Sequence, residues 1–210
     1  MARVDDYKKA AELARSALKE TNPKRVADRA GGRFEGAQGQ DPCLVIRFLN
    51  RQVKVCWPEV LPVYEETGEE LPIQQQVLLL HFLEGSGPGA PSGEWVAYQE
   101  IPDGKFYLDP FLRRAKNPMV QTFGEQPERL VTLAAKVYGG KPADEGDASV
   151  IVDALPGVPV LLILWQGDDE FPPEGNILFD RSIIGSLSAE DIAWLCGMII
   201  YPLVGMARQA

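Results

Sequence analysis

The chain lacks most of the residues from which metal sites and hydrolase active sites are built. His81 is the only histidine among 210 residues, and the three cysteines, Cys43, Cys56 and Cys196, do not stand at metal-ligand spacing. A histidine-rich transition-metal site is therefore excluded, and no zinc site is expected. A Ser–His–Asp arrangement would have to use His81, and no serine occupies a Gly-x-Ser-x-Gly turn. We expect neither a bound metal nor a cofactor.

Positive charge and long apolar runs are also scarce. The chain carries 21 Lys and Arg residues against 30 Asp and Glu residues, which gives a formal net charge of −9. Nucleic acid and anionic membranes repel such a chain, so we expect neither as a partner. The longest uncharged stretch, residues 192–206, is shorter than the roughly 20 residues of a bilayer span, and Pro202 interrupts it.

The N-terminal residues and the cysteines favour a cytoplasmic protein. Residues 1–13 contain acidic side chains and no apolar run, so no secretory signal is predicted. In a chain without such a signal, an odd number of scattered cysteines indicates reduced, buried thiols. We therefore predict a cytoplasmic location.

Composition and length indicate an ordinary globular chain. Hydrophobic residues make up 45% and charged residues 24% of the sequence, and 210 residues bury a sizeable core without metal or disulfide staples. The pattern changes from helical to strand-like at Arg33. We predict a helical N-terminal segment, residues 1–32, that packs on a single α+β domain formed by residues 33–210.

Helical periodicity and capping residues mark the helices. Asn22-Pro23 is typical of an N-cap followed by proline at the first helical position, and Gly31-Gly32 of a helix end. A capping box at Ser188 begins an apolar C-terminal helix, which Pro202 kinks or ends. The predicted helices span residues 5–21, 23–30, 72–83, 110–116 and 127–138, and a C-terminal stretch from 189.

Strands are predicted where β-branched and aromatic residues gather between turns. Residues 50–52 separate the first two strands, which indicates a hairpin, and residues 58–71 are predicted to be a connection. The uninterrupted apolar run at 160–165 is typical of a strand buried on both faces. The predicted strands span residues 44–49, 53–57, 95–99, 148–154, 159–166 and 176–179. The order favours a mostly antiparallel sheet with helices packed on one side.

The acidic segment, residues 165–182, is the most distinctive candidate site. It places Asp168, Asp169, Glu170 and Glu174 directly after the buried strand. Clustered carboxylates bind Mg²⁺ or Ca²⁺, or supply an acid with a raised pKa, so the first three residues are weak catalytic candidates. The alternatives are a solvated turn, which we favour, and a binding surface that includes Trp165.

Two other groups of residues are candidates for binding. Arg181 either forms an ion pair with Asp180 that pins the acidic segment, which we favour, or is presented to an anionic ligand. The aromatic/arginine stretch, residues 93–114, would form a pocket for a planar or anionic ligand, although its aromatics are more typical of a core. Its binding candidates are Trp95, Tyr107, Arg113 and Arg114.

The glycine-rich stretch at residues 85–93 does not indicate phosphate binding. It contains no lysine or arginine and no Gly-x-x-x-x-Gly-Lys pattern. Its prolines and acidic neighbours are typical of a linker or a lid.

Several motifs together resemble a bacterial and archaeal family of unknown function, domain-of-unknown-function family 3786. The resemblance spans roughly residues 20–205 and depends most on the acidic segment. It implies no activity, and some relatives carry an added iron–sulfur segment, which implies anaerobic redox or corrinoid metabolism; this chain lacks that segment. The motifs are Gly93-Glu94-Trp95, Phe106-Tyr107 with Phe111 and Arg113 or Arg114, Phe123-Gly124, Trp165 to Pro173, Leu178 to Ser182, and Leu187 to Asp191.

Three functions are carried forward. The leading hypothesis is a non-enzymatic accessory module that binds a small ligand or a protein partner through the acidic segment, with the aromatic/arginine stretch nearby. The first alternative is an enzyme that uses Asp168, Asp169 or Glu170 for metal binding or acid/base catalysis. The second is a homodimer formed through the C-terminal helix, with Leu203 and Met206 exposed.

Overall fold

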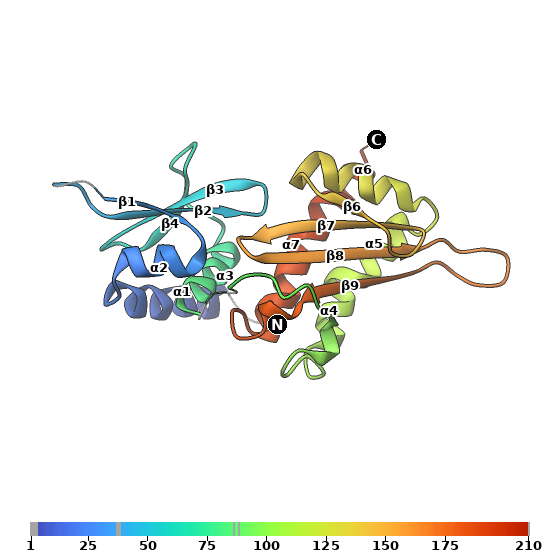
Figure 1. Ribbon diagram of the computed structural model, residues 1–210, viewed down its shortest axis with the longest axis horizontal. Coiled ribbons are helices and arrows are strands. Elements are labelled where there is room, and N and C mark those ends of the chain that lie inside the picture. Colours follow the sequence, from blue (N-terminus) through green and yellow to red (C-terminus); the bar gives the residue numbers. More distant parts are fainter. Residues whose placement is uncertain (1–3, 37–38, 86, 88, 210) are drawn as a thin grey trace. The chain divides into compact units, whose positions relative to one another are not determined.

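The computed structural model describes residues 4–36, 39–85, 87 and 89–209 of the chain (Figure 1). Two compact units are present: unit 1 contains residues 1–89, 155–157 and 185–187, and unit 2 contains residues 90–154, 158–184 and 188–210. Each unit has its own antiparallel sheet with helices, which confirms the predicted α+β class. The predicted boundary at residue 32 lies within unit 1, and that division into domains stays a prediction.

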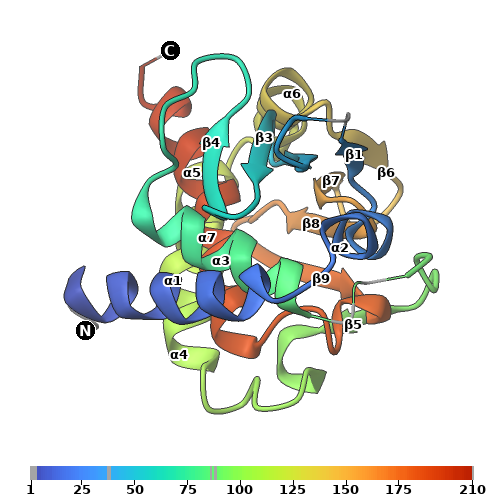
Figure 2. The same cartoon turned by 90° about the vertical axis from the view of Figure 1, so that its left-hand side faces the viewer.

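Unit 1 is a four-stranded antiparallel sheet packed against three helices. The strands lie in the order β1-β2-β3-β4, and α1 and α3 lie side by side (Figure 2). Ile46, Phe48, Val53 and Val55 are all but inaccessible on one face of the sheet. The elements are α1 (Val4–Lys19), α2 (Pro23–Ala30), β1 (Arg33–Glu35), β2 (Cys43–Phe48), β3 (Arg51–Cys56), β4 (Leu61–Tyr64) and α3 (Ile73–Glu84).

Local capping explains both ends of α2, as predicted. The Asn22 side chain accepts a hydrogen bond from the backbone N–H of Arg25 at 3.1 Å. Gly31 ends α2 with φ of 70°, a left-handed conformation that glycine adopts without steric cost. The indole N–H of Trp57 then donates to the Leu18 carbonyl at 2.9 Å and ties the end of α1 to the segment after β3.

Two features of unit 1 differ from the prediction. The connection at residues 58–71 contains a strand, β4, which the proline in its middle obscured; an edge strand tolerates Pro62. The β2–β3 hairpin turns at Leu49-Asn50, one residue earlier than predicted, and Arg51 already pairs with Phe48. Arg51 and Gln52 therefore belong to β3, where they pair with Phe48 and Arg47 of β2.

The expectation of three reduced thiols is wrong for two of the cysteines. Cys43 and Cys56 are register partners on β2 and β3 and form a disulfide. Their separation of 13 residues in the sequence carries no signal of this pairing, because only the strand register places them opposite each other. Cys196 is a free, buried cysteine, as predicted, and burial raises the pKa of its thiol.

Unit 2 is a five-stranded antiparallel sheet in the order β5-β9-β8-β7-β6. All side chains from Val160 to Leu164 on β8 are at most 3% exposed, which confirms the predicted strand buried on both faces. The strands are β5 (Trp95–Ala97), β6 (Lys141–Ala143), β7 (Ala148–Leu155), β8 (Val158–Trp165) and β9 (Glu174–Asp180).

The helices of unit 2 include one long continuous run. The predicted helix at 110–116 extends in both directions, and its middle is a π-turn, Leu112–Lys116. The predicted strand at 95–99 ends early, in a 3₁₀ turn at Tyr98–Glu100. The helices are α4 (Leu108–Phe111), α5 (Asn117–Phe123), α6 (Pro127–Tyr138) and α7 (Ala189–Ala207).

The C-terminal helix α7 begins at the predicted capping box and continues through Pro202. The Ser188 hydroxyl accepts from the Asp191 N–H at 3.1 Å, and the Asp191 carboxylate accepts from the Ser188 N–H at 3.4 Å. Leu203, predicted to be exposed, is fully buried. Within the described residues, α7 alone has the length and apolarity of a membrane span, and 61% of its apolar window is buried, so this is weak evidence for a membrane.

The disulfide leads to a stability prediction. Opening the Cys43–Cys56 bond removes a constraint on the unfolded chain, and its loop length implies a loss of about 3 kcal/mol in the free energy of unfolding. Urea unfolding with and without dithiothreitol measures this loss. The double variant Cys43→Ala/Cys56→Ala should have the same free energy of unfolding as the reduced protein, and dithiothreitol should not change it. Identical unfolding midpoints for oxidised and reduced wild-type protein would contradict the prediction.

Candidate functional site

The acidic segment is not one loop but a turn, a strand and a short helix. The turn at residues 166–173 extends past the ends of β8 and β9 as the long orange loop of Figure 1. Strand β9 follows, and a 3₁₀ helix at Arg181–Ile183 ends the segment. Because β9 has seven residues, Trp165 and Asp180 lie about 20 Å apart at opposite ends of the strand. The segment therefore forms two separate sites.

Asp168 holds the turn in shape. Its Oδ1 atom accepts hydrogen bonds from the backbone N–H groups of Glu170 at 2.8 Å and Phe171 at 2.7 Å. Its own N–H donates to the Phe171 carbonyl at 2.9 Å. The bonds from Phe171 and Glu170 lower the pKa of Asp168, the direction opposite to that of a proton donor. This is the local structural role that the sequence favoured.

Asp169 and Glu170 are exposed, and in the described structure their carboxylates accept no hydrogen bond that would hold the turn. The three consecutive acidic residues do not converge on one point. Among the described residues, no group of three or more His, Cys, Asp or Glu side chains is arranged to hold a metal ion. The turn thus presents charge to solvent and does not enclose it.

Asp180, at the other end of β9, is buried, and its carboxylate forms hydrogen bonds within the fold. Its carboxylate accepts from the Ser92 N–H and hydroxyl at 2.9 and 3.0 Å, from the Gly93 N–H at 2.7 Å and from the Ser182 N–H at 2.9 Å. Burial alone would raise the pKa of Asp180, but the hydrogen bonds from Ser182, Ser92 and Gly93 outweigh it and hold the pKa well below its usual range. Asp180 therefore fastens residues 92–93 to β9.

Arg181 forms an ion pair, but its partner is not the predicted one. Its Nε and Nη2 atoms each lie 2.7 Å from a carboxylate oxygen of Glu94, a two-point contact. The backbone N–H of Arg181 also donates to the Glu94 carbonyl at 2.9 Å. The sequence missed this pair because the two residues are 87 positions apart and meet only through the β5–β9 pairing. The ion pair supports β5 and does not pin the turn.

The aromatic/arginine stretch divides between the core and the surface. Tyr98 stacks on Phe111 with ring centroids 4.1 Å apart, and its hydroxyl donates to the Ala189 carbonyl at 2.6 Å, so these aromatics belong to the core. Burial raises the pKa of Tyr98. Trp95 lies opposite Asp180 on the paired strands.

The remaining candidates of this stretch have separate partners. Arg114 lies over the Trp194 ring, 4.2 Å from its centroid, and Arg113 pairs with Asp109 at 3.1 Å. The negative charge of Glu190 raises the pKa of Tyr107. Among the described residues, Tyr107, Arg113 and Arg114 line neither of the two hollows beside the β8–β9 turn.

A different surface forms around the turn, which we call the hairpin-tip surface: Trp165, Phe171, Lys116 and Glu174. Trp165 is 41% exposed and Phe171 68% exposed, unusual values for large aromatics. Lys116 and Glu174 lie 3.7 Å apart and line two adjoining shallow hollows of about 260 and 340 Å³. Nothing in the local sequence around Lys116 indicates its place in this surface, but the apolar Phe171 within an acidic turn is a signal that sequence reasoning could have used.

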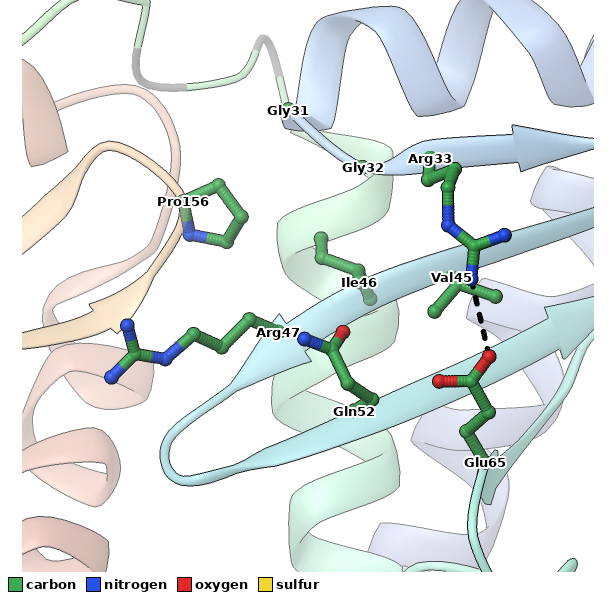
Figure 3. A pocket seen from close by; sticks show the side chains of 9 residues that line it. All are labelled: Gly31, Gly32, Arg33, Val45, Ile46, Arg47, Gln52, Glu65 and Pro156. Carbon is green, nitrogen blue, oxygen red and sulfur yellow. Dashed lines mark hydrogen bonds and ion pairs between the residues drawn. The ribbon is translucent and has the colours of Figure 1, made fainter. Parts of the chain in front are cut away.

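Unit 1 contains a separate hollow of about 360 Å³ on the open face of its sheet (Figure 3). Figure 3 shows the Arg33 guanidinium pointing at the Glu65 carboxylate, with 3.2 Å between them. Arg33 also pairs with Glu35, which in turn pairs with Lys54 at 3.0 Å. Of this network only Arg33 and Glu65 line the hollow, together with Arg47, whose Nε atom donates to the Leu49 carbonyl at 3.0 Å.

Comparison with known proteins identifies a family but no activity. Residues 22–201 match the family described as Domain of unknown function (DUF3786). We found no matching sequence among curated proteins and no matching solved structure. The match covers both ends of β9 and all four residues of the hairpin-tip surface.

The bonds of Asp180 lead to a pH-dependent prediction. Asp180→Asn removes the charge that strengthens those bonds and should lower the free energy of unfolding by about 1–3 kcal/mol near neutral pH. Because the pKa of Asp180 in the folded chain lies below its ordinary value of 3.8, this contribution is complete above about pH 4 and is lost as the pH falls further. Urea unfolding of both proteins at neutral pH and at about pH 3 measures it.

The control for this experiment is Asp169→Asn, which changes an exposed carboxylate of the same segment. It should unfold as the wild type does. A difference between wild type and Asp180→Asn that grows on acidification would show that the charge of Asp180 does not stabilise the fold.

Proposed function

The chain belongs to the DUF3786 family, a family of unknown function. We propose that it is a non-enzymatic module that binds a protein partner through the hairpin-tip surface. The observation that carries the proposal is the exposure of Phe171 on the turn and of Trp165 at the end of β8. The partner has a basic surface with an apolar hollow that receives Phe171.

The two aromatics supply the energy of binding. Exposed tryptophan, tyrosine and arginine side chains dominate the affinity of most protein interfaces. Covering the exposed part of Phe171 stabilises a complex by about 2–3 kcal/mol at ordinary values for apolar burial. Trp165, at the end of β8, adds a second exposed aromatic at this end of the sheet.

The turn is already ordered before binding, which reduces the entropic cost. Asp168 holds Glu170 and Phe171 through their backbone N–H groups. The Gln166 N–H donates to Asp147 at 2.8 Å, and the Gln166 side chain donates to the Glu125 carbonyl at 3.3 Å. A loop fixed at one end and in its middle loses less conformational freedom when a partner covers it.

The charge around the aromatics selects the partner. Asp168, Asp169, Glu170 and Glu174 carry four negative charges, and Lys116 carries the one positive charge among the residues that line the two hollows. A basic partner surface is attracted to this end of the sheet, and acidic surfaces are repelled. The net charge of −9 likewise supports a partner other than nucleic acid or an anionic membrane.

The geometry favours binding over the two alternatives. An acid/base role needs a carboxylate with a raised pKa in an enclosed site, but Asp168 is exposed and its pKa is lowered. A dimer through α7 would need the exposed Leu203 that the sequence predicted, and Leu203 is buried. Met206, the other residue predicted to be exposed, is half-buried. Self-association through other surfaces stays a separate proposal.

The setting of the proposed module is anaerobic redox or corrinoid-type metabolism in the cytoplasm. The metabolic part of this setting is supported by the family resemblance alone, and the cytoplasmic location by the N-terminal residues. The geometry of the hairpin-tip surface supports the binding role by itself.

A cross-linking experiment tests the proposal. The full chain is prepared with a photo-reactive phenylalanine analogue at position 171 and exposed to an extract of the source organism. The matched control carries the analogue at Phe106, which is 84% exposed and therefore more accessible than Phe171. We expect a polypeptide that cross-links from position 171 and not from position 106. Identical products from both positions would refute a specific surface.

The captured polypeptide is then purified and its affinity measured by titration calorimetry. Phe171→Ala should weaken binding about tenfold or more, and Phe106→Ala should leave it within about twofold. Asp169→Asn/Glu170→Gln should reduce the salt dependence of binding, because two exposed charges are removed. Melting temperatures of all variants should stay near that of the wild type. Equal affinities for wild type and Phe171→Ala would contradict the proposal.

A further inference from the structure

A second surface of unit 2 has the chemistry of a small-molecule site. It is a hollow of about 450 Å³ where α5, α6 and the C-terminal end of α7 meet, which we call the three-helix pocket. Figure 1 shows these helices at the end of the chain marked C. Its volume lies within the range of roughly 300–1,000 Å³ that small-ligand pockets occupy. Its walls come from unit 2 alone.

Two arginines give the three-helix pocket a positive charge within an acidic chain. Arg129 and Arg208 both line it, and the residues that line it include no aspartate or glutamate. In the part of the chain that the structure describes, neither arginine has a carboxylate partner, and the nearby Glu128 lies outside the lining. In the other hollows Arg33 pairs with Glu65 and Lys116 with Glu174, and Arg47, which also lines the unit 1 hollow, donates through its Nε atom to the Leu49 carbonyl at 3.0 Å.

Arg129 is held in place and still has donors to offer. Its Nη2 atom donates to the Ala207 carbonyl at 2.7 Å, near the end of α7. A guanidinium group has five N–H donors, so this bond fixes the side chain and leaves others for a ligand. The partial charge of about −0.5 at the end of α7 is smaller than the two full positive charges of the arginines. The pocket therefore favours an anion.

The remaining lining gives the ligand an apolar part and further polar contacts. Tyr201 is 54% exposed, and its ring lines the pocket with Pro118 and Val204. Thr122 adds a hydroxyl group on α5. Aromatic and aliphatic walls beside two guanidinium groups are suited to a flat molecule that carries an oxyanion.

We propose that the three-helix pocket binds a small organic anion, with a carboxylate or phosphate on Arg129 and Arg208 and a flat apolar body against Tyr201. The site lies on other side chains than the hairpin-tip surface and does not depend on the protein partner proposed above. Only Gln121, on α5, borders hollows of both.

Titration calorimetry of the full chain with benzoate and phenyl phosphate tests the proposal, with benzyl alcohol as the neutral probe. Both anions share the oxyanion and the flat ring, and the tighter one identifies the ligand as a carboxylate or a phosphate. At least one anion should bind about tenfold more tightly than benzyl alcohol, because charge-assisted hydrogen bonds are absent from the neutral probe.

Variants then separate a specific site from general attraction. Arg208→Gln and Arg129→Lys should each weaken binding of the tighter anion about fivefold or more; the lysine keeps the charge and a donor for Ala207 but loses the planar fork. The matched control Arg113→Gln removes an exposed arginine that pairs with Asp109 outside the pocket and should leave binding within about twofold. Melting temperatures of the variants verify that each is folded.

Two results would overturn the proposal. One is the absence of saturable binding of both anions up to about 20 mM, which lies beyond the affinity of useful small-ligand sites. The other is binding that Arg208→Gln and Arg129→Lys leave unchanged or that Arg113→Gln weakens equally. Neither result bears on the hairpin-tip surface, because those experiments use a protein partner and Phe171→Ala.

Discussion

The burial of β8 on both faces is the constraint on which unit 2 depends. Five consecutive side chains, Val160 to Leu164, are almost inaccessible, and burial of each stabilises the fold by about 1.5–3 kcal/mol. The sum of these five contributions is comparable with the net stability of a whole domain. Any displacement of β8 that exposes these side chains would lose much of this stabilisation, so β8 keeps one position in the sheet. A slip of β9 by one residue would turn Ile177 and Phe179 to the opposite face. The fixed register therefore places Trp165 and Glu174 at one end and Asp180 at the other.

The two ends use the same carboxylate chemistry for different purposes. Asp180 is 2% exposed and accepts hydrogen bonds from three residues, so its carboxylate holds residues 92–93 and 182 in place. Asp168 is exposed, but it too is occupied by backbone N–H groups. What the fold leaves for an external partner is Asp169, Glu170 and the aromatic Phe171. An acidic composition alone did not distinguish these roles, because exposure and backbone contacts decide them.

The sequence predicts what short-range physics determines. Asn22, Gly31 and Ser188 mark helix ends through bonds within a few residues, and the apolar run of β8 marks a buried strand by composition. Contacts set by register are different. The Cys43–Cys56 bond and the Arg181–Glu94 pair appear only once strands are paired, and β4 is hidden because Pro62 argues against a central strand. The choice of the acidic segment as the binding site stays a prediction; its aromatic residues Trp165 and Phe171 lie within that segment, whereas Lys116 meets Glu174 only through a tertiary contact.

The disulfide and the predicted cytoplasmic location lead to opposite expectations for the oxidation state of Cys43 and Cys56. Reducing compartments keep most thiols reduced, and disulfides that form there are usually transient. Strands β2 and β3 are already joined by six register pairs, and Leu44, Ile46, Val53 and Val55 are buried beside them. Unit 1 therefore has a core that does not require the covalent bond, and the bond adds to a hairpin that hydrogen bonds and apolar burial have specified. A chain in a reducing compartment keeps this hairpin with two opposed thiols, so the oxidation state changes its stability more than its fold.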